Sequence, residues 1–279
     1  MSEGTLADLS WLVIDVLLPF YLFYTTSQNA SIEALGQAPV VLLAGVFIPF
    51  LSLLVAPLLY KPLRVPETRR SVFSFCILLA NTAFLGIPIC EALFGSTGAF
   101  YAVIYDFGLT VVGFSMGIWL LSGGKFGDWK SMIINPLVIS VLLGLIVSTT
   151  GIAFPAWLTK PLSTVGQATL PIALLVAGAQ IGNLRFKKSE ISRDMSAVIA
   201  LRLVIVPLVM LGFFLISGSL DLSKNVIVME AAMPVAVSTT IMAKRFDADA
   251  RFTASATLFS TVLSMLSLPL LAILVLSLQ

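Results

Sequence analysis

The apolar residues of this chain form long runs separated by short polar segments. Nine runs are long enough to cross a bilayer, near residues 6–26, 39–60, 70–93, 98–121, 132–150, 161–182, 195–217, 222–243 and 250–277. A membrane-spanning helix needs about 20 predominantly apolar residues. The connections between the runs leave no room for a separate soluble domain. The pattern therefore predicts an all-α polytopic membrane protein with nine spans.

Two of these runs are interrupted near their middle, at corresponding places in the two halves of the chain. The first contains Asn81 and Thr82, followed by Gly86 and Pro88, and the second contains Pro234. Lipid does not tolerate unpaired backbone polar groups, so such breaks survive only where they line a cavity or pack against protein. Paired broken helices of this kind indicate the binding site of a secondary transporter.

Composition agrees with the membrane class. Hydrophobic residues make up 58% and charged residues 11% of the 279 residues, and the mean hydropathy is +1.05. The chain has no histidine, and Cys76 and Cys90 fit no metal-binding pattern. His-based catalysis and His-based zinc sites are therefore excluded. We expect no enzymatic activity, no metal, no cofactor and no nucleic-acid partner, while coupling to Na⁺ or H⁺ stays open.

The distribution of basic residues predicts the orientation in the membrane. Alternating spans place nearly all Lys and Arg on one side, at positions 61, 64, 69, 70, 125, 130, 185, 187, 188, 193, 244, 245 and 251, while the other side has only Lys160 and Lys224. Basic loops stay in the cytoplasm. We therefore expect a multi-pass protein of the inner (plasma) membrane, with a cytoplasmic N-terminus and an external C-terminus.

The second half of the chain resembles a repeat of the first. The landmarks that recur at offsets of 152 to 158 residues are Pro19 with Pro171, Pro49 with Pro207, Asn81 with Val235, and Phe100 with Phe252. Prolines also recur in membrane helices without any repeat, which is the alternative. Residues 1–125 hold four predicted spans and residues 126–279 hold five, so two five-span repeats would be inverted across the membrane. We expect an arrangement of two five-span repeats in which the first repeat lacks its first helix. A groove or a homodimer contact should then lie beside Asp15.

At these motifs the sequence resembles the auxin efflux carrier family. The matching segments are residues 80–88 (ANTAFLGIP), 105–106 (YD), 202–207 (RLVIVP), 231–234 (AAMP) and 242–246 (MAKRF). The resemblance implies ten helices in two inverted repeats, with two broken helices that cross at mid-membrane as in bile-acid symporters and sodium–proton antiporters. It also implies transport of small organic anions, which are auxin in plants and dicarboxylates such as malate or malonate in some bacterial members.

The chain departs from the family pattern at three places. We expect the family's first helix to be missing from the plan. Plant members have a proline where this chain has Ala80, so we expect a softer first break. Plant members often carry a polar amide where this chain has Val235. The short loops are typical of a bacterial member.

The residues at the two breaks are the predicted substrate-binding residues: Asn81, Thr82, Gly86, Pro88, Pro234, Val235 and Ser238. The N–H groups at the start of the half-helix that follows a break point toward an anion, and its dipole favours negative charge there. Pro234 removes a backbone donor and frees a carbonyl one turn earlier. The alternative is that the polar residues only bond neighbouring helices, and that Gly86 and Pro88 only permit packing and a kink.

Three charged residues within the spans are candidates for ion coupling or charge pairing. Glu230 lies one turn before Pro234, where an unpaired charge is costly, so we expect it to be protonated, paired or cation-bound. Asp106 is a candidate for pairing or proton relay. Arg202 either snorkels to the surface or pairs with an intramembrane acid. Glu91, near the outer end of its span, is expected to reach water.

Four functions compete on this evidence. The leading one is a secondary carrier for a small organic anion that works by alternating access around the crossing. The second is a sodium-coupled symporter of the bile-acid-carrier type, with Glu230 and freed carbonyls as Na⁺ ligands. The third is a non-transporting membrane sensor. The fourth, an intramembrane aspartyl protease, needs a second catalytic aspartate on a later span, and the aspartates after Asp106 lie in predicted loops.

Overall fold

A computed structural model describes residues 3–29, 32–124, 136–150, 154–169, 171–172, 175–176, 178–179, 192–218 and 220–278, and these residues are helical with one isolated β-bridge and no strand. The first half contains α1 (Glu3–Trp11), the π-helix η1 (Leu12–Leu17), α2 (Leu18–Asn29), α3 (Ile32–Tyr60), the 3₁₀-helix η2 (Glu67–Arg69), α4 (Arg70–Leu78), the π-helix η3 (Thr82–Gly86) and α5 (Ile87–Leu121). The second half contains α7 (Pro136–Thr150), α8 (Ala156–Gln167), α10 (Arg193–Ala200), the π-helix η5 (Leu201–Ile205), α11 (Val206–Ile216), α12 (Leu222–Ala231), α13 (Ser238–Arg245) and α14 (Ala250–Ser277).

Five helical stretches among the described residues are long and apolar enough to cross a membrane: Gly4–Ser27, Ala34–Tyr60, Thr82–Leu121, Arg193–Ile216 and Ala250–Ser277. Thr82–Leu121 consists of two helices that join at Gly95, whose φ of 68° favours glycine. This turn coincides with the predicted connection between the third and fourth spans. The predicted spans 132–150 and 161–182, and the basic residues at 125, 130, 185, 187 and 188, lie wholly or partly outside the described residues.

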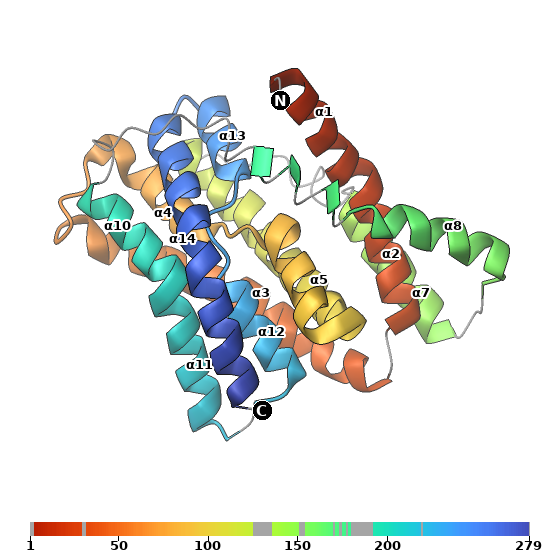
Figure 1. Ribbon diagram of the computed structural model, residues 1–279. Helices are drawn as coiled ribbons and strands as arrows, with labels where there is room; N and C mark the ends of the chain where they lie inside the picture. Colours follow the sequence, from red (N-terminus) through yellow and green to blue (C-terminus); the bar gives the residue numbers. More distant parts are fainter. Residues whose placement is uncertain are drawn as a thin grey trace.

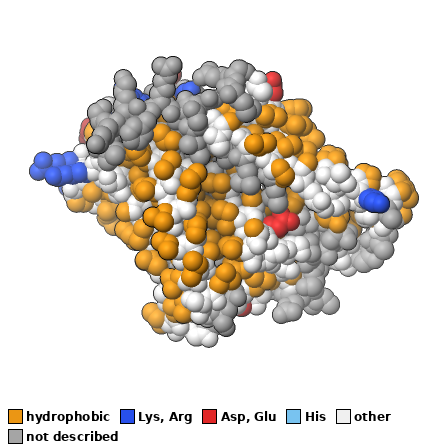
Figure 2. Space-filling view, viewed as in Figure 1, with side chains coloured by type: hydrophobic (Ala, Val, Ile, Leu, Met, Phe, Trp, Pro, Cys, Tyr) orange, Lys and Arg blue, Asp and Glu red, His pale blue; other side chains and the backbone are white. Residues whose placement is uncertain are grey.

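The surface of the long helices is apolar where it would face lipid. On α3, large hydrophobic side chains recur along one exposed stripe, which consists of Leu43, Phe47, Leu51, Leu54 and Leu58. Figure 2 shows hydrophobic side chains over much of the visible face, with Lys and Arg at its margins. A soluble monomer rarely exposes contiguous apolar surface of this extent. The described helices therefore form a multi-pass membrane protein.

The helices form two bundles of unequal size. The small bundle comprises α1, η1, α2, α7 and α8, and the large bundle comprises α3, α4, α5 and α10 to α14 (Figure 1). Gly144 lets α7 approach α2 closely, because a β-carbon there would lie 2.8 Å from the Thr26 β-carbon. Asp15 is exposed on η1.

The two bundles meet where α2 contacts α5. At this contact the Tyr21 hydroxyl donates a hydrogen bond of 2.7 Å to Glu91 Oε2. From the sequence, Glu91 was expected only to reach water. In the structure it also accepts a hydrogen bond from Tyr21, a buried residue. This hydrogen bond links the small bundle to the large one. It is made by the part of α5 that lies between the first break and the turn at Gly95.

Charged residues from three loops meet at one end of the large bundle. Arg69 pairs with Asp194, at the start of α10, and with Asp249, before α14, each at 3.0 Å. Asp249 also caps α14 by accepting from the Phe252 N–H at 2.9 Å. Partial burial lowers the pKa of Arg69, but its hydrogen bonds to both carboxylates outweigh that effect and raise the pKa above its usual value. The charge pattern predicts that these three segments lie on the same side of the membrane, and the structure places them at one end of the large bundle.

Candidate functional site

The first predicted break interrupts the helix between α4 and η3. The chain leaves the helix at Leu79, which has an extended backbone (φ −99°, ψ 112°). Asn81 has φ −85° and ψ 58°, and the helix resumes at Thr82. Ala80 stands where plant members of the family are expected to have a proline, and the backbone here is non-helical without it. The reason is that groups from the second break hold this segment open.

The second break separates α12, which ends at Ala231, from α13, which begins at Ser238. Pro234 lacks an N–H, so a continuous helix would lose a hydrogen bond to the Glu230 carbonyl. That carbonyl instead accepts from the Met233 N–H at 3.2 Å. The carbonyl that the sequence predicted to be freed by Pro234 is therefore already bonded.

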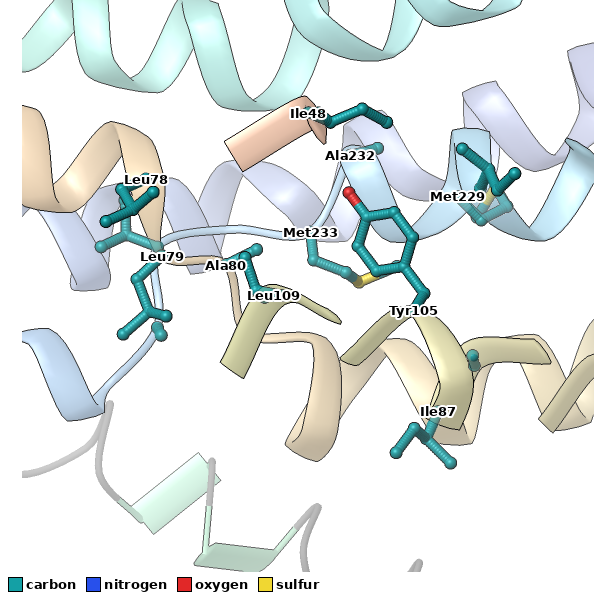
Figure 3. Close-up of a cluster of buried hydrophobic side chains, with 14 of the residues drawn as sticks. Ile48, Leu78, Leu79, Ala80, Ile87, Tyr105, Leu109, Met229, Ala232 and Met233 are labelled. Carbon is teal, nitrogen blue, oxygen red and sulfur yellow. The ribbon is translucent and has the colours of Figure 1, made fainter. Parts of the chain in front are cut away.

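The two breaks bind each other through their backbones, in a short antiparallel bridge between Ala80 and Val235. Its hydrogen bonds run from the Asn81 N–H to the Pro234 carbonyl at 2.8 Å and from the Ala236 N–H to the Leu79 carbonyl at 3.0 Å. We call this place, where residues 79–81 meet residues 234–236, the crossing. Figure 3 shows buried side chains around it, among them Leu79, Ala80, Ala232, Met233 and Tyr105. Each break thus supplies backbone partners for the other, which satisfies groups that lipid would leave unpaired.

Hydroxyl groups of α14 support the second break. The Val235 N–H donates to Ser260 Oγ at 3.1 Å, and the hydroxyls of Thr239 and Thr257 both donate to the Ala236 carbonyl, at 2.7 and 3.4 Å. Ser260 and Thr257 were not among the predicted site residues. The signal that would reveal them is a set of buried hydroxyl residues at helical spacing in an apolar run: Thr253, Thr257, Ser260, Thr261 and Ser264.

Arg202 is 2% exposed and lies deep in the large bundle. Its Nε and Nη2 donate to the Met233 carbonyl at 3.3 and 3.0 Å, and its Nη1 donates to the Ile77 carbonyl at 3.1 Å. The snorkelling interpretation is wrong, because the guanidinium is buried at the crossing. No carboxylate among the described residues lies within ion-pair distance of it. Its partners are the carbonyls of both breaks.

Glu230 is fully buried in the last turn of α12. Its carboxylate packs against the backbone of Gly86, where an added β-carbon would overlap both oxygens. The Cys90 thiol donates to Oε1 at 3.5 Å, while Oε2 has no hydrogen-bond partner in the described part of the chain. Glu230 and Gly86, two predicted site residues from different halves of the chain, therefore form one contact.

The remaining predicted site residues lie at the two breaks and on α5. The Thr82 hydroxyl donates to Asp106 Oδ1 on α5, so these two predicted residues are brought together. The amide nitrogen of Asn81 is buried without a partner. Pro88 is buried in the first turn of α5, and Ser238 is partly exposed at the start of α13. Val235 is fully buried in the bridge, which leaves its side chain no open space.

An apolar cavity of about 440 Å³ begins one turn beyond the crossing. Its lining comes from η3, α5, α14 and Gly178, and includes Leu85, Ile89, Leu93, Thr261, Ser264 and Leu268. The Leu85 N–H bonds to the Asn81 carbonyl at 3.3 Å, so the cavity starts next to the first break. The polar crossing and the apolar cavity therefore adjoin.

Lipid-facing helices around two discontinuous helices that pair at their breaks define a membrane transporter with broken helices. The chain matches the family described as membrane transport protein over residues 2–123 and 125–272, and it belongs to this family, which is that of the auxin efflux carriers.

Relatives of this chain have been named as transporters. One, an "Uncharacterized transporter" of Methanothermobacter thermautotrophicus, is 28% identical over 274 residues that cover 97% of this chain and 89% of the relative. "Uncharacterized transporter MJ1031" of Methanocaldococcus jannaschii is 24% identical and covers 97% of this chain and 90% of its own length. "Uncharacterized transporter YfdV" of Escherichia coli is 27% identical over 67% of this chain and 63% of its own length. These names indicate a transporter and not an enzyme.

Proposed function

We propose that this protein is a secondary carrier of a small organic anion and that the carboxylate of the substrate binds at the crossing. The observation that carries the proposal is the buried amide nitrogen of Asn81, which has no hydrogen-bond partner among the described residues. This donor lies at the start of a half-helix, where N–H groups and the helix dipole favour an anion. Ser238 begins the other half-helix, as Thr82 begins the first.

The adjoining cavity suggests the shape of the substrate. Its lining is largely apolar, with the hydroxyls of Thr261 and Ser264 as exceptions. Such a cavity suits an aliphatic or aromatic body, and the polar crossing suits a carboxylate. We infer a substrate with one or two carboxylates on a small apolar body, and alternating access by movement of the large bundle against the small one.

The coupling ion is a separate question. Glu230 Oε2 is buried and unpartnered, which favours a proton or a cation at this carboxylate. The sodium-coupled alternative also needs carbonyl ligands, and the carbonyls of Ile77 and Met233 are bonded to Arg202. This occupancy favours proton coupling or a uniporter over sodium coupling.

A ligand screen on the purified protein tests the anion proposal. We expect mono- and dicarboxylates with a small apolar body to raise the thermal unfolding midpoint, because a ligand at 100 times its Kd stabilises by about 2.7 kcal/mol. The matched control is the uncharged amide of each acid. The proposal fails if no acid stabilises the protein or if amides stabilise it equally. Uptake of the best acid into liposomes then separates a carrier from a sensor.

We also propose nine spans, arranged as inverted repeats over residues 1–125 and 126–279, with the N-terminus in the cytoplasm. Single cysteines at Glu67 and Ser96, both exposed, test this in a background without Cys76 and Cys90. An impermeant maleimide applied to intact cells should label the cysteine at position 96 and not that at position 67. Permeabilised cells, in which both should react, are the control. Equal labelling on intact cells would contradict the orientation.

A further inference from the structure

The two breaks leave backbone carbonyls without helical partners at the ends of α4 and α12. In a continuous helix the Ile77 carbonyl would accept from the N–H of Asn81, four residues later. That N–H instead donates to Pro234 in the bridge, so the Ile77 carbonyl is released. The Met233 carbonyl lies in the non-helical segment that follows α12. Both carbonyls therefore need a donor from elsewhere.

Arg202 supplies that donor from a third helical stretch. Its guanidinium bonds the Ile77 carbonyl through one edge and the Met233 carbonyl through the other. These two carbonyls come from opposite halves of the chain. A planar guanidinium with several fixed donors fits this two-sided geometry, and it keeps its charge in a buried site.

The charge of Arg202 also matches the electrostatics of this place. A helix C-terminus carries about half a negative charge, so two such ends that converge attract about one positive charge. In carriers with broken helices, unwound carbonyls and half-helix C-terminal ends hold the coupling Na⁺. In this structure a guanidinium bonds carbonyls of this kind, with no carboxylate within ion-pair distance among the described residues.

We propose that Arg202 is a tethered cation that occupies the place of a coupling Na⁺ at the C-terminal ends of α4 and α12. The consequence is a crossing that needs no sodium. With both C-terminal ends neutralised, the N-terminal ends at Thr82 and Ser238 give the substrate site its positive potential. Arg202 is therefore a positioning and selectivity residue. This role in selectivity rests on the proposed anion transport, whereas the cation role does not.

The first test uses the wild-type protein without substrate. Its thermal unfolding midpoint is measured in sodium, potassium and choline chloride at equal ionic strength. We expect the same midpoint in all three salts, because the cation is already part of the chain. A midpoint that rises with Na⁺ to a plateau, with no such rise in K⁺ or choline, would overturn the proposal.

The second test removes the tethered cation. Arg202→Ala should lower the unfolding midpoint, and millimolar guanidinium or Na⁺ should raise the midpoint of this variant by about 5 °C, a shift that corresponds to roughly 3 kcal/mol in a chain of this size. Lys244→Ala, which removes an exposed cytoplasmic charge, is the matched control and should respond to neither ion. Loss of stability that neither ion restores would mean that Arg202 only packs, and would overturn the proposal.

A third variant decides the matter if Arg202→Ala does not fold. Arg202→Lys keeps the positive charge, so its midpoint should remain independent of Na⁺. Sodium dependence of the lysine variant would contradict a role for the charge. All three measurements are made without substrate. Failure to find a transported anion would therefore leave them intact, and a sodium-dependent wild type would leave the anion screen intact.

Discussion

Replacing Asn81 with alanine is expected to weaken binding of the carboxylate substrate by more than tenfold. The Asn81 side-chain nitrogen is buried and unpartnered, so it is free to donate to an anion. Such a hydrogen bond to a charged group contributes about 1.5–3 kcal/mol, and each 1.4 kcal/mol corresponds to about a tenfold change in Kd. The backbone bridge should survive, because Asn81 contributes its N–H to that bridge and not its side chain.

Two further variants sharpen this experiment. Asn81→Asp keeps the shape and replaces the donor by a carboxylate, so it should weaken anion binding further. Thr253→Val, which removes a buried hydroxyl bonded within α14, is the control and should bind as the wild type does. Isothermal titration with the best ligand from the screen measures all three. Wild-type affinity in Asn81→Ala would show that the anion binds elsewhere and that the break serves packing.

Replacing Glu230 with glutamine is expected to abolish the response of transport to a pH gradient. The carboxylate is fully buried with one oxygen unpartnered, and an unpaired charge in this place is costly. The carboxyl group therefore gains or loses a proton only when the site changes its access to water. Glutamine keeps the shape beside Gly86 and cannot take part in proton exchange. Transport driven by membrane potential alone should continue.

Uptake into liposomes under imposed gradients measures this effect. Glu67→Gln, which changes an exposed carboxylate in the loop before α4, is the matched control and should keep the full pH response. Each protein is assayed with a pH gradient, with a membrane potential and with neither. A Glu230→Gln protein that still follows the pH gradient would move proton coupling to another group, with Asp106 as the next candidate.

The positions of the two breaks could be predicted from the sequence. Pro234 cannot continue the hydrogen bonds of a helix, and Asn81 and Thr82 are polar residues in the middle of an apolar run. The structure confirms non-helical backbone at both places. Local chemistry was sufficient here, because the loss of a backbone donor and a polar interruption are both properties of a short segment.

The partners of the buried charges could not be predicted in the same way. Arg202 bonds carbonyls that are 31 and 125 residues away, and Glu230 contacts a thiol 140 residues away. A sequence pattern can show that a buried charge needs a partner, because an unpaired one is costly in a membrane. It does not show which of the available groups comes within reach.

By itself, the sequence determined that this is a multi-pass membrane protein of the auxin efflux carrier family whose helices break near Asn81 and Pro234. Hydrophobic run length and residue chemistry are local quantities that survive without knowledge of the fold. Only the tertiary structure decided that the breaks bond each other, that Arg202 joins their carbonyls and that hydroxyls of α14 support them. The physical reason is that a backbone group released by a break takes whichever donor or acceptor the packing of distant helices brings to it.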